Sequence, residues 1–485
     1  MKMCLKHFAT CILLFITCLP FHSFGQDGTI DPTFNPGTGA NAMLHTTVVQ
    51  PNGKIIITGD FITYNGASKK GLARLESNGN PDASFDPGTG ISGVNATILV
   101  TALQSDGKIL IGGNFTGFNG VARNGIARLN TDGSLDTSFN PGRGVAGVSV
   151  PAVRAIVIQP DKKIIIGGDF ATCGDYDRRS IARLDTSGIV DIGFSTGASF
   201  PIGTVGLEDG VNTIGIQNDG KLIVGGRFNF VGLVARNRIA RLETNGTLDP
   251  GFNTVTDRTD YISTVAVQAD QKILVGGSLF VNDLGGGSFS DINLLRVNEN
   301  GSIDPGFYMG DVEADPQRLW TILLQSDGKF IISGVIQYYN HWYAGGIGRV
   351  NADGTWDGNF NAGFGVGFSP ASITQAALQP DDGKVIVVGN FTSFDGVPRN
   401  YVARLKGDPC GGSNTKTWTG ALSTSWHNVG NWTCGLPNSG STVVVNAGAG
   451  NMPEVTQSVS VKKLTLKNGA VVTVKAGVDL TVTGN

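Results

Sequence analysis

The sequence predicts an all-β protein: a seven-bladed β-propeller of four-stranded blades, closed by its N-terminal strand and followed by a short C-terminal β module. Three observations support this fold class. A motif with a core close to D-G-K-I recurs seven times at spacings of 51 to 58 residues, and repeats of this size are typical of stacked units that share an apolar face. No copy has the 3.6-residue hydrophobic period of a helix. One element of the motif stands ahead of the first copy, at Asp31, and is missing after the last.

Each copy contributes the same three polar residues. The core lysines are Lys54, Lys108, Lys163, Lys221, Lys272, Lys329 and Lys384. An arginine follows 20 residues later, or 24 in the fifth copy, giving Arg74, Arg128, Arg183, Arg241, Arg296, Arg349 and Arg404. The D-x-x-F elements begin at Asp31, Asp82, Asp136, Asp191, Asp249, Asp304 and Asp357. A catalytic residue is needed once, whereas these recur, so we interpret the arginines and aspartates as structural pairs between neighbouring strands.

The displaced Asp31 element indicates a closed ring. It precedes the first core, at Asn52–Lys54, and no such element follows the last arginine, Arg404. A closed ring gains from this order because the N-terminal strand completes the last blade and removes an exposed sheet edge. An array of six-stranded β-sandwiches is the alternative, and it does not account for the displacement.

The second copy illustrates the strands expected in each blade. They lie at 98–103, 108–111, 126–129 and 135–139, and D-G turns join the first to the second and the third to the fourth. The pair Gly112–Gly113 is expected where blades converge on the axis. All D-G turns then share one face. The opposite face carries the loops between second and third strands and the links between blades; we call it the loop-rich face, and we expect binding there.

Two stretches resemble known families. The run D-G-K-I-L-I-G-G-N-F at residues 106–115, with the A-R-L and D-T-S-F-N-P-G sequences after it, resembles the delta-60 repeat family of bacterial β-propellers. This resemblance covers 27–406, with copies five and six departing most, and implies an exported bacterial protein without a settled activity. The segment with Trp418, Trp426 and Trp432 resembles a surface β-helix-type module of exported Bacteroidetes proteins, and we expect the three tryptophans in its core.

The expected domains follow from these patterns. Residues 1–25 form a signal peptide cleaved after Gly25, because two lysines precede a short apolar run and small residues precede the cut. Residues 26–406 form the propeller, 407–416 a linker, and 417–485 a Trp-rich β module with the strand pattern that opens a parallel β-helix. We therefore expect a secreted or cell-surface protein whose mature chain has no transmembrane segment. Cys410 and Cys434 are the candidate disulfide pair, the alternative being that they stay unpaired.

Composition and motifs narrow the function. The formal net charge is −3 and charged residues make up 15% of the chain, which leaves no electrostatic footprint for nucleic acid. No metal-binding spacing of histidine and cysteine occurs, and no nucleophile or phosphate-loop motif. We therefore expect no catalytic residue, metal ion or cofactor.

One aromatic cluster occurs in a single copy. In copy six the usual polar loop is replaced by Tyr338, Tyr339, His341, Trp342 and Tyr343. Aromatic rings stack on sugars or anchor protein partners, so these residues are the ligand-binding candidates. The alternative is that some of the rings fill a gap beside a diverged blade.

The preferred function is a non-catalytic exported scaffold or adhesion-type binding protein that presents its loop-rich face to glycan or protein. The alternative is a secreted carbohydrate-active enzyme, a glycosidase or lyase, on a propeller scaffold. Unrepeated carboxylates that converge at the axis would favour the enzyme. An axis lined by repeat residues and glycine would favour the binding protein.

Overall fold

The computed structural model has strands and no helix in the residues it describes. These residues are 27–195, 210–253, 258–282, 289–309, 312–313, 318–325, 327–367, 370–379, 383–407, 415–420, 423–427, 432, 437, 441–447, 449, 451–467 and 469–484. The expected signal peptide, Cys410 and Cys434 lie outside them. No helix in this part of the chain is long and apolar enough to cross a membrane.

Each repeat forms one main antiparallel sheet of three strands in the described residues, and the strands of each main sheet follow chain order. The first four sheets are β1 (Leu44–Val49), β2 (Ile55–Gly59) and β5 (Leu72–Leu75); β7 (Ile98–Leu103), β8 (Ile109–Gly113) and β11 (Ile126–Leu129); β13 (Ala152–Ile158), β14 (Ile164–Asp169) and β17 (Ile181–Leu184); β18 (Val211–Ile216), β19 (Leu222–Gly226) and β22 (Ile239–Leu242). The others are β23 (Arg258–Val267), β24 (Ile273–Asn282) and β25 (Phe289–Val297); β27 (Arg318–Leu324), β28 (Phe330–Val335) and β31 (Ile347–Val350); β32 (Ser372–Leu378), β33 (Val385–Asn390) and β36 (Val402–Leu405).

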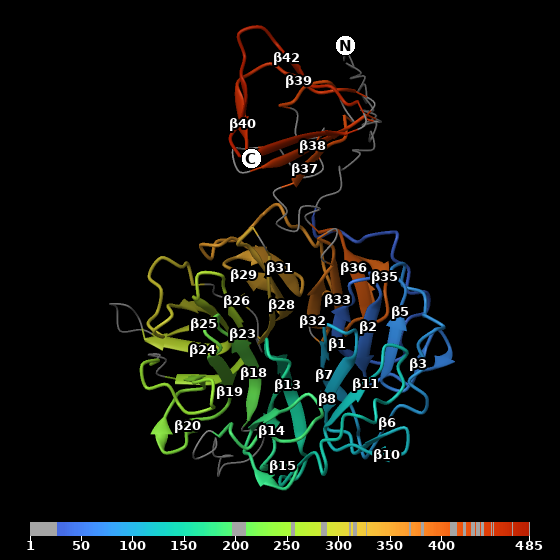
Figure 1. Cartoon of the computed structure of the whole chain (residues 1–485), viewed down its shortest axis with the longest axis vertical. Coiled ribbons are helices and arrows are strands. Elements are labelled where there is room, and N and C mark those ends of the chain that lie inside the picture. The colour runs from blue at the N-terminus through green and yellow to red at the C-terminus, as the bar shows by residue number, and fades with distance from the viewer. Residues whose placement is uncertain are drawn as a thin grey trace, which may run out of the picture.

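The sheets surround a common centre. The first strand of each sheet contacts the first strand of the next, in the order β1, β7, β13, β18, β23, β27, β32, and β32 in turn contacts β1. Figure 1 labels six of these first strands, all but β27, near the centre, with the outer elements β3 (Thr63–Tyr64), β15 (Thr172–Cys173) and β20 (Phe230–Val231) at the rim. Between the last sheet and the first, Thr374 Oγ1 donates to the carbonyl of Leu44 at 2.8 Å. The arrangement is that of a β-propeller.

The fourth strand expected in each repeat is reduced to a single antiparallel bridge. The bridges are Leu75 to Pro81, Leu129 to Leu135, Leu184 to Val190, Leu242 to Leu248, Val297 to Ile303, Val350 to Trp356 and, for the last sheet, Leu405 to Ile30. The repeated aspartate stops the ladder: Asp82 Oδ1, for example, accepts a hydrogen bond from the Ser84 N–H at 2.9 Å. A side chain that bonds its own backbone in this way competes with strand pairing.

The Gly112–Gly113 pair does not face the axis as expected. Both glycines lie on β8, the second strand, beside a register shift between Ile98 and Val100 on β7. A Cβ on Gly113 would lie 2.0 Å from the Thr97 carbonyl oxygen. Gly113 therefore permits a close backbone approach at a bulge, a recurring use of glycine inside a strand. Gly112 instead leaves room for the next sheet, because a Cβ there would lie 2.8 Å from Val153 Cγ1.

Short hairpins between second and third strands lie on the same face as the links between sheets. Three links, β6 (Ile91–Ser92), β12 (Val145–Ala146) and β26 (Val312–Glu313), pair with hairpin strands β9, β15 and β29. The hairpins are β3 (Thr63–Tyr64) with β4 (Ala67–Ser68), β9 (Gly117–Phe118) with β10 (Val121–Ala122), β15 (Thr172–Cys173) with β16 (Tyr176–Asp177), β20 (Phe230–Val231) with β21 (Val234–Ala235), β29 (Tyr338–Tyr339) with β30 (Trp342–Tyr343), and β34 (Ser393–Phe394) with β35 (Val397–Pro398). In the fifth repeat the extended strands β24 and β25 take the place of the hairpin.

The C-terminal module pairs its strands in parallel. β37 (Thr415–Trp418), β38 (Thr442–Asn446) and β41 (Lys463–Lys467) form one sheet, β39 (Glu454–Val455) pairs with β42 (Thr473–Val474), and β40 (Val459–Val461) pairs with β43 (Leu480–Val482). The three tryptophans form its core together with Val443, Val445, Val455 and Val461. Their expected burial is confirmed: the Trp432 ring lies 4.9 Å from that of Trp418 and 4.7 Å from that of Trp426, centroid to centroid.

Candidate functional site

The repeated charges form the same cluster in every sheet. In the second repeat, Arg128 Nε and Lys108 Nζ both lie 2.7 Å from Oδ2 of Asp136, and the Arg128 guanidinium lies 4.8 Å from the centroid of the Phe139 ring. The arginine contacts the repeat aspartate at 2.5 to 3.0 Å in all seven copies. Burial raises the pKa of Asp136, but hydrogen bonds from Lys108, Ser138 and Arg128 outweigh it and lower the pKa. These carboxylates are held as anions by the framework.

The seventh cluster is completed from the N-terminus. Arg404 Nε lies 2.8 Å and Lys384 Nζ 3.2 Å from Oδ2 of Asp31. Asp27 supplies a second link, because its Oδ2 accepts from Arg349 Nη2 at 3.0 Å. In the other repeats the aspartate of the cluster follows the arginine by eight residues. In the seventh repeat the N-terminal Asp31 takes that place.

The aromatic cluster predicted as a ligand site splits into two parts. Residues 338–343, the copy-six hairpin, turn at Asn340 and His341 with φ of 47° and 68°. Tyr339 is fully buried, and its hydroxyl donates to the Gly354 carbonyl at 2.8 Å. Tyr64 makes the equivalent bond to Gly79 at 3.0 Å. This indicates a structural role for Tyr339, which fills the core position that each hairpin occupies with its second residue; ligand contact by Tyr339 stays a prediction.

The rest of the copy-six hairpin stays at the surface. Tyr338 packs edge-on against Tyr343 with ring centroids 5.5 Å apart, and the Tyr343 hydroxyl donates to the Phe364 carbonyl at 3.2 Å. Trp342 is 60% exposed. None of these side chains, nor that of His341, lines the pocket described next.

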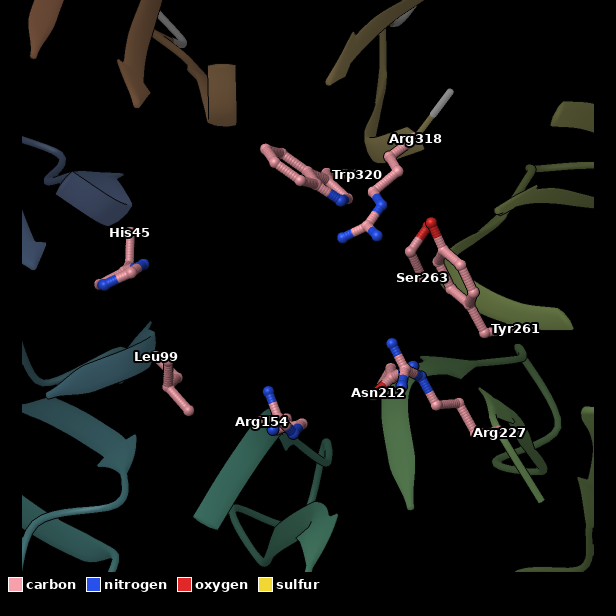
Figure 2. A pocket seen from close by; sticks show the side chains of 9 residues that line it. All are labelled: His45, Leu99, Arg154, Asn212, Arg227, Tyr261, Ser263, Arg318 and Trp320. Carbon is pink, nitrogen blue, oxygen red and sulfur yellow. The ribbon is translucent and has the colours of Figure 1, made fainter. Parts of the chain in front are cut away.

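A pocket of about 280 Å³ opens at the centre of the ring. Its lining residues are His45, Leu99, Arg154, Asn212, Arg227, Tyr261, Ser263, Arg318 and Trp320, and Figure 2 shows them around an open centre. We call this the axial pocket. Eight of the nine lie on the first strands of six sheets, near the end that follows the links. The axial pocket therefore opens on the loop-rich face.

One position of the first strand supplies most of the axial pocket. It is occupied by a different residue type in every copy: His45, Leu99, Arg154, Asn212, Ser263, Trp320 and Thr374. Its surroundings repeat, because a buried aliphatic residue precedes it and a glutamine follows five residues later in all seven copies. The change of residue type at this position, between repeated neighbours, makes the axial pocket the candidate ligand site. Our sequence reasoning missed these residues, and alignment of the seven copies is the signal that would have found them.

The axial pocket is lined by cations and aromatic rings. Its nine described lining residues include three arginines and one histidine but no aspartate or glutamate. Arg154 Nε contacts Asp169 Oδ2 at 2.5 Å, and the Arg227 guanidinium lies 5.1 Å from the centroid of the Tyr261 ring. Arg318 is exposed and makes no ion pair with a described residue.

His45 has a fixed partner at the pocket wall. Its Nε2 lies 2.9 Å from Asp60 Oδ1, which also accepts a hydrogen bond from Thr97 Oγ1 at 2.7 Å. The hydrogen bond with His45 lowers the pKa of Asp60, so this carboxylate is held as an anion behind the pocket. Among the described residues, no group of three or more histidine, cysteine or acidic side chains is placed to hold a metal ion.

Two family models match the chain. A model described as "Domain of unknown function (DUF5122) beta-propeller" matches residues 50–85, 104–139, 159–194, 217–252, 268–307 and 381–408. These segments leave out the sixth repeat, which supplies Arg318 and Trp320 to the axial pocket. A second model, "Domain of unknown function (DUF8693)", matches residues 417–485. No curated protein was found to match the chain. Six segments of the chain thus match the model of a β-propeller repeat family.

Solved structures with similar folds have low sequence identity. The extracellular domain of a putative hybrid two-component system from B. thetaiotaomicron is 12% identical, with a TM-score of 0.43; the alignment covers 77% of this chain and 40% of that one. PorZ, a surface component of the type-IX secretion system of Porphyromonas gingivalis, is 14% identical with a TM-score of 0.41, over 78% and 48%. Virginiamycin B lyase from Staphylococcus aureus is 13% identical with a TM-score of 0.44, over 77% and 97%. The chain thus spans less than half the length of the first two.

Proposed function

We propose that the chain is a non-catalytic exported binding protein: a closed seven-bladed propeller of the delta-60 type that takes its ligand in the axial pocket. Export rests on the N-terminal sequence, with residues 1–25 as the cleaved signal and a secreted or cell-surface location for the rest. Closure is supported by the two contacts of the N-terminal segment, Asp31 with Arg404 and Asp27 with Arg349. The parallel strands of 417–485 support a β-helix-type module after the propeller.

The variable first-strand position is the single observation that carries the binding function. A scaffold alone needs only the repeated residues, which already form the sheets and their charged clusters. Seven different residue types at one position, six of them facing one pocket, serve no purpose shared by the blades. Concave pockets with a few converging polar groups are where small ligands bind.

The lining of the axial pocket favours binding over the alternative of a carbohydrate-active enzyme. Glycosidases use a pair of carboxyl groups on either side of the scissile bond. The described lining residues provide cations and rings instead, and the nearby Asp60 and Asp169 are engaged by His45 and Arg154. We expected the axis to be lined either by repeat residues and glycine, for a binding protein, or by converging carboxylates, for an enzyme. The axial pocket has neither lining, because its described residues differ between copies and include no aspartate or glutamate.

A second contact surface remains in the proposal. Trp342, with Tyr338, His341 and Tyr343 beside it, exposes a ring on the loop-rich face and would suit a glycan or a protein partner. This surface and the axial pocket each contain one tryptophan from the sixth repeat, so the two can be compared by the same substitution.

The test is a glycan array probed with the mature chain, residues 26–485, as wild type, Trp320→Ala and Trp342→Ala. We expect wild-type protein to retain at least one glycan, Trp320→Ala to lose most of that signal, and Trp342→Ala to keep it. Loss of the glycan signal with Trp342→Ala but not with Trp320→Ala would show that the ligand binds at the copy-six hairpin. No wild-type signal above background would overturn glycan binding. We expect the bound glycan to stay intact. Cleavage of the bound glycan into shorter products would favour the enzyme.

A further inference from the structure

We infer that the axial pocket recognises an acidic sugar, a ring that carries a carboxylate or sulfate group. This inference deepens the proposed function and rests on it. The anionic group would lie among Arg154, Arg227 and Arg318, and the sugar ring would lie against Trp320 or Tyr261.

The arrangement of charge calls for an anion. Figure 2 shows the guanidinium groups of Arg154, Arg227 and Arg318 directed toward the open centre. Arginine stays protonated in proteins, so this convergence of like charges cannot be relieved by loss of a proton. Arg154 has its counter-charge in Asp169, whereas Arg318 forms no ion pair with a described residue. A ligand carboxylate or sulfate would supply the missing negative charge through hydrogen bonds that the charge strengthens.

Two of the three arginines, Arg154 and Arg227, are held in place before any ligand arrives. Asp169 Oδ2 accepts from Arg154 Nε at 2.5 Å, which orients that guanidinium. The Tyr261 ring supports Arg227 at 5.1 Å, a geometry in which a cation is attracted to the ring face. Groups already fixed in their binding geometry lose less conformational entropy when the ligand binds.

The aromatic rings explain why we infer a sugar rather than a simple ion. Trp320 and Tyr261 are only partly buried, and both face the pocket. Such rings offer flat apolar surface to the C–H faces of a sugar. His45 and Leu99 line the side across the opening from Tyr261 and Arg227. At about 280 Å³, the pocket is slightly smaller than typical ligand sites, which start at about 300 Å³. It therefore suits a terminal sugar rather than a long buried chain.

The test uses matched ligand pairs that differ in charge alone. Isothermal titration of the mature chain would compare trigalacturonic acid with its methyl ester, and a sulfated galactose trisaccharide with its desulfated form. Inorganic sulfate and a hexa-aspartate peptide serve as non-sugar anions. The protein variants are Arg318→Ala, Trp320→Ala and the control Arg143→Ala, an arginine with an 83% exposed side chain outside the pocket. Thermal melting checks that each variant is folded.

We expect one acidic sugar to bind at least about tenfold more tightly than its neutral counterpart, as one lost charged hydrogen bond implies. Arg318→Ala should weaken the acidic ligand about tenfold to a hundredfold and leave the neutral one unchanged. Trp320→Ala should weaken both, and Arg143→Ala neither. Preference between the two acidic sugars identifies the anionic group as carboxylate or sulfate.

Three results would overturn the inference: equal affinity for the charged and neutral sugars, binding of hexa-aspartate or inorganic sulfate without any acidic sugar, or no effect of Arg318→Ala. Failure of the proposed function looks different. If the protein binds a neutral glycan and Trp320→Ala abolishes that binding, the axial pocket is still the ligand site, and only its preference for acidic sugars is wrong. If Trp320→Ala leaves every bound glycan in place, the axial site itself is wrong.

Discussion

Arg404 Nε donates to Asp31 Oδ2 at 2.8 Å across 373 residues of chain. In the second repeat the same two atom types meet at 2.7 Å between Arg128 and Asp136, eight residues apart. The N-terminal segment therefore supplies to the last sheet what the other sheets make locally. The apolar seam between last and first sheets includes Phe34, Ile55, Ile386 and Val402 in one cluster, so the contact is part of a continuous core.

The long-range pair gives a direct stability prediction. Asp31→Ala leaves the buried Arg404 without its carboxylate and should lower the free energy of unfolding by about 3–5 kcal/mol. Asp82→Ala, which removes the same contact within one repeat, is the matched control and should cost a similar amount in urea unfolding. Only Asp31→Ala should also make residues near 30–40 sensitive to brief proteolysis. An Asp31→Ala protein with wild-type stability and proteolysis would contradict the closure.

The repeated aspartates predict acid sensitivity. Burial raises the pKa of Asp31, but hydrogen bonds from Thr33, the charge of Arg404 and a hydrogen bond from Lys384 bring it down to about 2. The pKa values of Asp249, Asp304 and Asp357 are also about 2. An unfolded aspartate titrates near about 3.9, so the stabilisation is fully present above that pH and is lost as pH falls toward 2. Urea midpoints should drop steeply between about pH 4 and 2; a flat profile there would show that these carboxylates are not stabilised by folding.

The buried tyrosine of the copy-six hairpin should behave as a core residue. Tyr339→Phe and Tyr64→Phe each remove one hydroxyl that donates to a carbonyl, of Gly354 or Gly79. We expect each to cost about 1 kcal/mol of stability and neither to change glycan retention. Phe118 fills the same hairpin position without a hydroxyl, so the ring alone is compatible with the fold. A binding defect in Tyr339→Phe at unchanged stability would return this residue to the ligand site.

Cys173 should be inert in the folded protein. It is fully buried on β15, and burial raises the pKa of its thiol to about 12 even though Arg178 acts in the opposite direction. The thiolate is the form of cysteine that attacks thiol reagents, so native protein and Cys173→Ala should react to the same extent. In denaturant the wild type should gain one reactive thiol over the variant. Labelling of Cys173 in the native protein would contradict its placement in the core.

The repeat made most of the framework predictable. The strands at 98–103 and 126–129 are those of β7 and β11, because alternating apolar residues and D-G turns determine the pairing locally. The displaced Asp31 element predicted that the N-terminal segment lies beside the last sheet, where Asp31 contacts Arg404. The fourth strand was not predicted correctly, since an aspartate at its start bonds its own backbone and shortens the ladder to one bridge.

The axial pocket could not be seen in any single repeat. His45, Arg154 and Trp320 have no motif in common, and each occupies an ordinary strand position in its own copy. Only the ring brings them together, because it places the equivalent position of successive first strands around one axis. The exposed aromatic residues near Trp342 attracted the sequence prediction instead, since a cluster along the chain is visible without a fold.

The most direct measurement follows the tryptophans during ligand binding. Residues 26–485, the expected mature chain, contain six tryptophans: Trp320, Trp342, Trp356, Trp418, Trp426 and Trp432. Fluorine labelling of the indoles should give resolved NMR signals, which Trp320→Phe and Trp342→Phe would assign. On addition of trigalacturonic acid or the sulfated trisaccharide, we predict that the Trp320 signal shifts and that the Trp342 signal stays. A shift of Trp342 with an unchanged Trp320 signal would contradict the axial pocket as the ligand site.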